Sequence, residues 1–592
     1  QLRILGMGTI RHMSINTRVK RPIIQEGGLG PLFAAVEDEI QDVDLIRQCS
    51  SILGNIAENG ENQITLIKDG ILPRLVHLSE FDHPEVRADV SRTYALLTSN
   101  VENHTGVFGA AEVKSMLKLT ESEEEATKRD ALVSIGNIAI IMKNQLMIAK
   151  LGGLAAISDS LDSQFESCQR FACRCVYRLS AHGDLQRQTL NSGAVPRLSK
   201  LCYSPSALVR KFAAMSLCNI SVDESNQHLM DRLGVLPPLI KLLEDSEEIC
   251  ARYAAMTLTN LATEGSNQEA IVKQGALPLL IALASAQDTE ASRFAGMAIA
   301  NLAANRRNRA IIVSLGGLHP LTLMSFAKSL ETQRSAALSL YNLSCAAVNH
   351  VPMIRADVIT SLANLGAAND LECKRYSIMT LANLAANVET RAAATRSGGL
   401  QTAVALGKDE DLDCRRYACI AMTNMANSPI TQEQLVVHGA LPMILQMAED
   451  KTDLESQRQA LLGLNNLAAC EVNHSTMVHK GTIKVLLSAF QSPDADCREY
   501  AAFSLANMCS NPDYLEMLGA EGAIPPLIML SRSENLNTVC LGTAALRRLA
   551  NVDENWPRLV QAGVLDSLAA SGLNEEKEVL LETAAAICAI SL

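Results

Sequence analysis

The sequence of 592 residues has few aromatic side chains: they make up 3% of the chain, and Trp556 is the single tryptophan. Leucine, alanine, isoleucine and methionine must therefore fill the interior, which favours closely packed helices. The sequence also has no run of 18 or more apolar residues, the minimum length for a membrane-spanning helix. We therefore expect no direct insertion into a membrane.

An excess of positive charge is missing as well. The chain has 52 Lys and Arg against 64 Asp and Glu, a formal net charge of −12. The only basic cluster is the short stretch at 305–310. Because nucleic-acid binding needs a basic surface that attracts phosphates, we expect no nucleic acid among the partners.

Catalytic and metal-binding motifs are missing too. The 16 cysteines form no CxxC pair and no Cys/His cluster at metal-ligand spacing, so we expect reduced, mostly buried thiols in a cytoplasmic protein. The 11 histidines form no HExxH motif, and no nucleophile motif or phosphate-binding glycine loop occurs. The sequence therefore predicts no enzymatic activity, no catalytic residue, no metal and no cofactor.

The sequence does contain a short motif that recurs at a fixed interval. The stretch "RYAAMTLTNLA" at 252–262 recurs in similar form at 293, 375 and 416. Its asparagine marks a position that we call position 0, which recurs every 41 residues apart from one interval of 42 and one of 43. Position 0 is held by His12, Asn55, Leu96, Asn137, Arg178, Asn219, Asn260, Asn301, Asn342, Asn383, Asn424, Asn466, Asn507, Arg548 and Ala589. This period predicts a stack of about fourteen similar structural units.

The sequence of one unit, residues 260–301, predicts three helices. "SNQEAIVKQG" is a short first helix that Gly275 ends in the left-handed conformation. "ALPLLIALAS" is a second helix with Pro278 in its first turn, and "SRFAGMAIANLAAN" is a longer third helix. A glycine follows position 0 by fifteen residues in all repeats except those with Ala111 and Asp357. Asparagine also recurs seven residues after position 0, as in Asn267, where we expect the N-cap of the first helix.

The block Gly275, Ala276, Leu277, Pro278 and Leu280, followed by an A-x-x-L-x-N-[LI]-[AS] helix, resembles the consensus of the armadillo repeat family. The resemblance covers nearly the whole chain. It implies an all-α, right-handed superhelical solenoid of about fourteen three-helix repeats of ~41 residues. We expect one continuous domain over 1–592, with a partial first repeat at 1–20 and the last repeat at 551–592. Since the chain opens inside a repeat, we also expect it to be a piece of a longer protein.

The asparagines point to a candidate binding surface. On a helical wheel, Leu258, Leu261 and Ala262 point to one side and Asn260 to the other. The resemblance implies that third helices line a concave groove, where the asparagines form a ladder. We define the asparagine ladder by its uninterrupted members: Asn219, Asn260, Asn301, Asn342, Asn383, Asn424, Asn466 and Asn507.

The ladder suits an extended protein segment. An asparagine amide offers donors and an acceptor that match a peptide backbone, and the resemblance implies such a grip. Helices roughly 8–10 Å apart give a ladder on the order of 65 Å long, enough for roughly 20 extended residues. Alternatively, the asparagines bond their own helix or the neighbouring repeat. Both interpretations stay open.

Aromatic and arginine side chains flank the ladder at positions −7 and −8. The groove-flanking candidates are Tyr253, Phe294, Tyr376, Tyr417, Arg252, Arg293, Arg334, Arg375 and Arg416. They suit acidic or aromatic side chains of a ligand. The alternatives are packing between repeats for the aromatics, and pairing with an acid three residues earlier for the arginines, as Glu290 precedes Arg293.

Position −4 separates this chain from the importin-α type, whose repeats carry tryptophan there. Here it holds residues such as Met256, Met297 and Met379, never tryptophan, so a nuclear-import receptor is disfavoured. We expect a non-enzymatic scaffold or adaptor that holds an extended segment of another protein. The alternatives are a permanent structural component of a large ciliary, axonemal or cytoskeletal assembly and, less favoured, an organelle-surface adaptor. We expect a cytoplasmic location, with cytoskeletal or ciliary association as an option.

Overall fold

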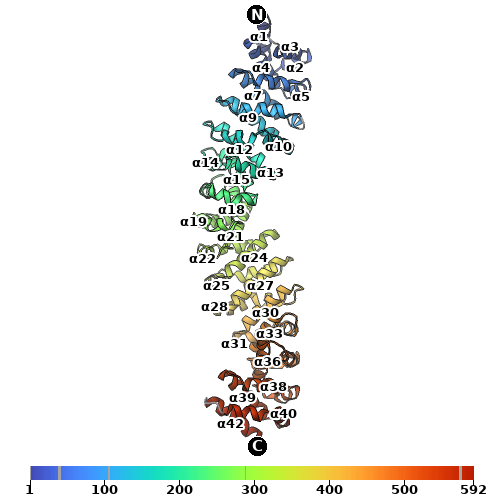
Figure 1. The fold of residues 1–592 in the computed structure, drawn as a ribbon, viewed down its shortest axis with the longest axis vertical. Helices are drawn as coiled ribbons and strands as arrows, with labels where there is room; N and C mark the ends of the chain where they lie inside the picture. The colour runs from blue at the N-terminus through green and yellow to red at the C-terminus, as the bar shows by residue number, and fades with distance from the viewer. Residues whose placement is uncertain (1, 38–41, 105–106, 287–288, 573–576, 592) are drawn as a thin grey trace. The chain divides into compact units, whose positions relative to one another are not determined.

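The computed structural model describes all residues except 1, 38–41, 105–106, 287–288, 573–576 and 592. It divides the chain into two compact units: unit 1 is Gln1–Asn305 and unit 2 is Arg306–Leu592. Throughout the described residues the regular elements are helices and there is no strand, which confirms the all-α prediction (Figure 1). One continuous domain over 1–592 stays a prediction.

Unit 1 repeats a pattern of two short helices and one long helix. Its short helices are α2 (Lys20–Gln25), α3 (Leu29–Val36), α5 (Gly60–Lys68), α6 (Ile71–Ser79), the turn η1 (Val101–Asn103), α8 (Ala110–Leu119), α10 (Met142–Lys150), α11 (Gly153–Ser160), α13 (Gly183–Asn191), α14 (Ala194–Leu201), α16 (Glu224–Arg232), α17 (Leu236–Leu242), α19 (Gly265–Lys273) and α20 (Ala276–Ala284). Its third helices are α1 (Leu2–Ser14), α4 (Val43–Ala57), α7 (Pro84–Ser99), α9 (Glu125–Ile138), α12 (Glu166–Ser180), α15 (Ala207–Ser221), α18 (Glu248–Leu261) and α21 (Thr289–Leu302). Within unit 1, each third helix from α1 to α18 packs against the next one along the chain.

Unit 2 follows the same pattern. Its short helices and turns are α22 (Asn308–Ser314), α23 (Leu318–Met324), η2 (Ala347–Asn349), α25 (His350–Arg355), α26 (Val358–Gly366), α28 (Val388–Ala394), η3 (Thr395–Gly399), α29 (Leu400–Leu406), α31 (Pro429–Val437), α32 (Ala440–Glu449), α34 (Glu471–His479), α35 (Thr482–Phe490), η4 (Pro512–Tyr514), α37 (Leu515–Glu521), α38 (Ile524–Ser531), η5 (Asp553–Asn555), α40 (Trp556–Gln561) and α41 (Val564–Ser571). Its third helices are α24 (Leu330–Ser344), α27 (Leu371–Ala386), α30 (Leu412–Ala426), α33 (Leu454–Ala468), α36 (Ala495–Met508), α39 (Leu536–Ala550) and α42 (Lys577–Ser591). Here too each third helix packs against its successor.

The periodic glycines end the first helices as predicted. Gly275 has φ 87°, in the left-handed region that favours glycine, and the other glycines at this repeat position share that sign. In one of the two repeats without this glycine, Asp357 keeps the same conformation with φ 52°. Ala111 instead lies inside α8.

The third helices supply a large part of the core of each unit. In α18, Leu258, Leu261 and Ala262 are fully buried, as the helical wheel predicts. The alanines at positions −5 and −6, Ala255 and Ala254, are also fully buried. Because small side chains let neighbouring third helices approach closely, an interior with few aromatics remains closely packed.

The N-cap prediction for the second asparagine of the repeat is wrong for Asn267. Asn267 lies inside α19, and the N-cap is Glu264, whose side chain accepts from the backbone N–H of Ser266. The buried Asn267 Nδ2 instead donates to the carbonyl of Leu261, 3.0 Å away at the end of α18, and to the carbonyl of Gln227 in the preceding repeat. The asparagine therefore ties the third helix and the preceding repeat to the first helix.

Candidate functional site

In α18, four positions of the third helix form a partly exposed stripe. These are Asn260 at position 0, Met256 at −4, Tyr253 at −7 and Arg252 at −8, all half-buried while their neighbours Ala254, Ala255 and Leu258 are buried. A helix of 3.6 residues per turn brings positions 0, −4 and −7 onto one face. The ladder asparagines are half-buried in every repeat. They lie in unit 1 at Asn219, Asn260 and Asn301, and in unit 2 at Asn342, Asn383, Asn424, Asn466 and Asn507.

In most ladder asparagines, one amide hydrogen serves the structure of the stack. Asn260 Nδ2 donates to Ser221 Oγ (2.9 Å) and Asn383 Nδ2 to Ser344 Oγ (3.0 Å), both in the preceding repeat. Where no hydroxyl is available, a backbone carbonyl of the preceding third helix accepts, as Ala382 does from Asn424 at 3.2 Å. The ladder therefore contributes to cohesion between repeats.

The amide oxygen of these asparagines, Oδ1, stays available as a hydrogen-bond acceptor. Among the described residues, no hydrogen bond reaches Oδ1 of Asn260, Asn383 or Asn424. A backbone N–H of a partner segment can donate to this oxygen without disturbing the bond between repeats. The structural and the binding interpretations of the ladder are thus compatible.

The arginines at position −8 of unit 2 bond to the following repeat. Arg375 Nη2 lies 2.5 Å from Asp411 Oδ1, and Arg334 Nη2 lies 2.6 Å from Asp370 Oδ2. These aspartates are N-caps of the next third helices: Asp411 accepts from the backbone N–H of Cys414 and Asp370 from that of Cys373. The hydrogen bond from the arginine lowers the pKa of Asp370 and of Asp411 to about 2, against the effect of burial.

Some of the predicted pairs with the acid three residues earlier are present but longer, whereas Glu372 pairs with Arg334 of the preceding repeat at 3.6 Å rather than with Arg375. Asp413 and Arg416 lie 3.5 Å apart, and Glu290 and Arg293 lie 3.8 Å apart. In unit 1, Arg252 lies 3.6 Å from Glu290 of the next repeat. Most of the arginine row therefore already has carboxylate partners.

The aromatic candidates line cavities in unit 2 and pack between repeats. Tyr376 and Tyr417, with Met379 and Glu372, line a cavity of about 270 Å³ between α27 and α30. A second cavity of about 270 Å³, lined by Tyr417, Ile420 and Arg416 among others, follows between α30 and α33. The Tyr376 ring also stacks on Tyr341 of the preceding repeat, with centroids 5.7 Å apart.

The aromatic candidates of unit 1 have arginine neighbours. The Arg293 guanidinium carbon lies 4.4 Å from the centre of the Phe294 ring, a cation–π geometry. Tyr253 is half-buried beside Arg252. These rings are held in place and keep part of their surface exposed.

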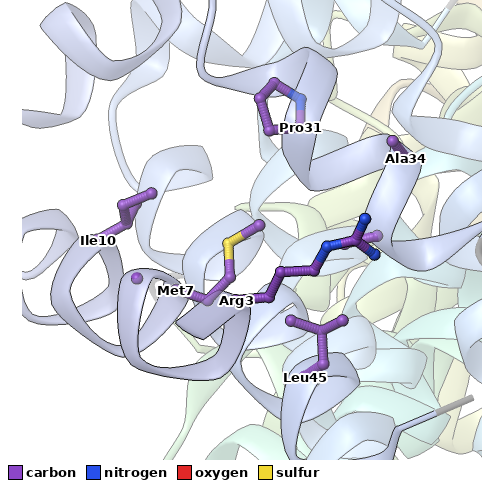
Figure 2. Close-up of a pocket in the computed structure, with 8 residues that line it drawn as sticks. Arg3, Met7, Ile10, Pro31, Ala34 and Leu45 are labelled. Atoms are coloured by element: carbon purple, nitrogen blue, oxygen red, sulfur yellow. The ribbon is translucent and has the colours of Figure 1, made fainter. Parts of the chain in front are cut away.

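A larger cavity of about 410 Å³ lies at α1, away from the ladder. Figure 2 shows Met7 and Ile10 of α1 lining it with Pro31 of α3 and Leu45 of α4, and Arg3 extending among them. Its lining is mostly apolar, and no ladder asparagine contributes to it.

The thiols occupy the core rather than a reactive site. Twelve of the sixteen cysteines are buried and all are free, in agreement with the sequence-based expectation. Burial raises the pKa of Cys175 to about 12, so this thiol stays protonated near neutral pH. Among the described residues no group of His, Cys, Asp and Glu side chains could hold a metal ion. Within the same residues, no helix combines the length and apolar character needed to cross a membrane.

The chain matches no family model and no curated protein in sequence. It does match solved structures. One is a chain from a study of the cadherin–beta-catenin interaction and the conserved phosphorylation switch that controls it, with TM-score 0.61 and 17% identity over 88% of this chain and 99% of that chain. Another is an engineered protein, with TM-score 0.57 and 25% identity over 68% of this chain and 99% of that one. A shorter designed armadillo repeat protein aligns over 39% of this chain and 99% of its own, with 24% identity and TM-score 0.37.

The first two of these structures share the fold of this chain. The chain has an armadillo-like helical repeat fold, and the resemblance inferred from its sequence is confirmed.

Proposed function

We propose that this protein is a non-enzymatic scaffold that holds an extended segment of a partner protein along its third-helix surface. The observation that carries the proposal is the ladder itself, in which half-buried amides recur at one repeat position and keep Oδ1 available, as at Asn383, where Tyr376 and Met379 occupy positions −7 and −4. The cadherin–beta-catenin chain supports a protein-binding role, because it shares the fold and belongs to a protein–protein interaction.

The proposal includes two finer expectations. The occupant is an extended peptide segment, and the location is cytoplasmic. Permanent incorporation into a ciliary or cytoskeletal assembly is the alternative to a reversible adaptor, and resistance of the complex to salt extraction distinguishes the two.

The test uses a peptide selected from a random 16-residue display library on the intact chain, with affinity measured by fluorescence anisotropy. Replacement of Asn383, Asn424 and Asn466 by alanine removes three amides from unit 2. We expect the affinity to fall at least about tenfold, since each neutral hydrogen bond contributes ~1 kcal/mol.

A matched control separates binding from cohesion. Ser344→Ala removes the acceptor of the Asn383 amide in the preceding repeat but leaves Asn383 in place. We expect this variant to bind the peptide as the wild type does. Equal binding by the triple asparagine variant, or an equal loss in Ser344→Ala, contradicts the proposal.

A further inference from the structure

Helix α12 of unit 1 carries three arginines on one face. Arg170, Arg174 and Arg178 are four residues apart and occupy positions −8, −4 and 0, so Arg178 replaces the asparagine of other repeats. All three are half-buried. We call them the α12 arginine cluster.

The cluster has no carboxylate partner among the described residues. Arg174 Nη2 donates to Asn137 Oδ1 at 3.1 Å, and Arg178 Nη1 donates to the Gly136 carbonyl. The Arg170 and Arg174 guanidinium carbons lie 4.5 and 4.9 Å from the centre of the Phe171 ring. These neutral contacts hold the side chains but leave their charge unbalanced.

Nearby carboxylates have other partners. Glu166, one turn before Arg170, accepts from Ser206 Oγ at 2.6 Å, and Glu125 accepts from Ser167 Oγ at 2.6 Å. Asp130 accepts from Arg129 Nε at 2.8 Å. Among the described residues, none of these acids forms an ion pair with the cluster.

In Arg174, one donor of the guanidinium group is unsatisfied. Its Nε is buried and has no hydrogen-bond partner, a costly state for a charged group. Burial lowers the pKa of Arg174, and repulsion from Arg178 and Arg170 lowers it further. Gly136 lies beside this side chain: a Cβ there would be in ordinary van der Waals contact with it, 3.4 Å from Nη2 and 3.5 Å from Nε.

We propose that the α12 arginine cluster binds an acidic side chain of a protein partner, either a carboxylate or the phosphate of a phosphorylated residue. Guanidinium groups donate paired, charge-assisted hydrogen bonds to both kinds of anion, and partial burial strengthens the attraction. This site goes beyond the scaffold function proposed above, because it lies upstream of Asn219 and uses no ladder asparagine.

The test titrates the intact chain with three fluorescein-labelled 12-residue peptides in a Gly/Ser background. One carries three central glutamates, one a single phosphoserine and one three lysines, and anisotropy reports binding. We expect the acidic peptides to bind and the lysine peptide not to bind. The tighter of the two acidic peptides identifies the anion.

The decisive variant is Arg174→Gln with Arg178→Gln. We expect at least about a tenfold loss of affinity, the effect of losing one or more charge-assisted hydrogen bonds. The matched control, Arg197→Gln with Arg210→Gln, removes the same number of charges from guanidinium groups that already pair with Asp162 and Asp245 at 2.7 and 2.6 Å. We expect less than about a twofold change in this control, because long-range charge effects are screened by salt.

Failure of both acidic peptides to bind the wild type overturns the proposal, as does an equal loss in the control. Circular dichroism checks folding, and Arg170→Gln replaces the double variant if that variant unfolds. The triple asparagine variant of unit 2 should bind the acidic peptides normally, so this test and that of the scaffold function can fail separately.

Discussion

Arginines at the same repeat position have opposite surroundings in α12 of unit 1 and in the third helices of unit 2. In unit 2, Arg375 and Arg458 each bond the N-cap aspartate of the next third helix, Asp411 and Asp494. In unit 1, Arg170 occupies the same position, but Ser206 stands where unit 2 has the aspartate. Ser206 turns its hydroxyl to Glu166 instead.

One residue at the start of a neighbouring helix thus decides what an arginine can do. With an aspartate there, the guanidinium joins consecutive repeats and has little capacity left for a ligand. Without it, the guanidinium keeps its charge for an outside anion. In α12 the effect is reinforced by Arg174 and Arg178, which also lack a carboxylate partner among the described residues.

Ser206→Asp should give α12 the arginine–aspartate pair that the third helices of unit 2 have. The new carboxylate would cap α15 and pair with Arg170 as Asp411 pairs with Arg375. We expect affinity for the glutamate peptide to fall about tenfold, because the cluster loses one charge and gains a competing anion. Ser206→Asn, which caps without charge, should bind within about twofold of the wild type; anisotropy titration compares the two, and equal losses would disprove the electrostatic explanation.

Asp411→Ala tests the same difference in unit 2, by removing the N-cap aspartate of α30. Asp411 accepts from the Cys414 N–H as the N-cap of α30, so its loss should reduce the free energy of unfolding by about 1 kcal/mol. Ser206 makes no capping hydrogen bond to α15, so Ser206→Ala should cost only about 0.3 kcal/mol. Urea unfolding, with hydrogen exchange of α30 and α15, measures both, and the prediction fails if the two variants are equally destabilised.

The repeat architecture was predictable because many copies of one pattern support it. The glycine that ends the first helix and the apolar positions of the third helix recur together. An exception such as Ala111 therefore did not obscure the rule. Asp357 shows that the backbone requirement is stronger than the residue identity, since it adopts positive φ without being glycine.

The contacts between repeats were not predictable in the same way. Asn267 was expected to be an N-cap, but α19 begins before it, and its partners Leu261 and Gln227 lie in other elements. A contact such as Arg375 with Asp411 joins residues 36 positions apart. A comparison of the residue at position −8 of each repeat with the residue at position −13 of the next repeat would have indicated this pair. Unit 2 repeats the arginine and the aspartate at these positions, whereas the aspartate is missing after α12.

Arg174→Met and Arg375→Met should shift stability in opposite directions. Arg174 leaves a buried Nε without a partner, so methionine at this position should stabilise unit 1 by about 0.5 kcal/mol while weakening binding of the acidic peptide. Arg375 bonds Asp411 through two nitrogens, so methionine there should lower the urea midpoint. Two shifts of the same sign in urea unfolding would show that the surroundings of the arginines do not control their role.

Acid should reveal the smallest difference between the units. The folded-state pKa of Asp370 and of Asp411 is about 2, below the ordinary value of 3.8, because Arg334 and Arg375 bond their carboxylates. A lowered pKa stabilises the folded state above the ordinary value, and this contribution disappears as the pH falls from about 4 through about 2. At pH 4 we expect less than about a twofold loss of hydrogen-exchange protection in α27 and α30 relative to pH 7, and a larger loss near pH 2.5.

Helix α12, whose arginines have no such aspartate, should show a smaller change, and Asp411→Asn should abolish the response of α30. If α12 and α30 lose protection in parallel, the acid sensitivity does not arise from the arginine–aspartate pairs.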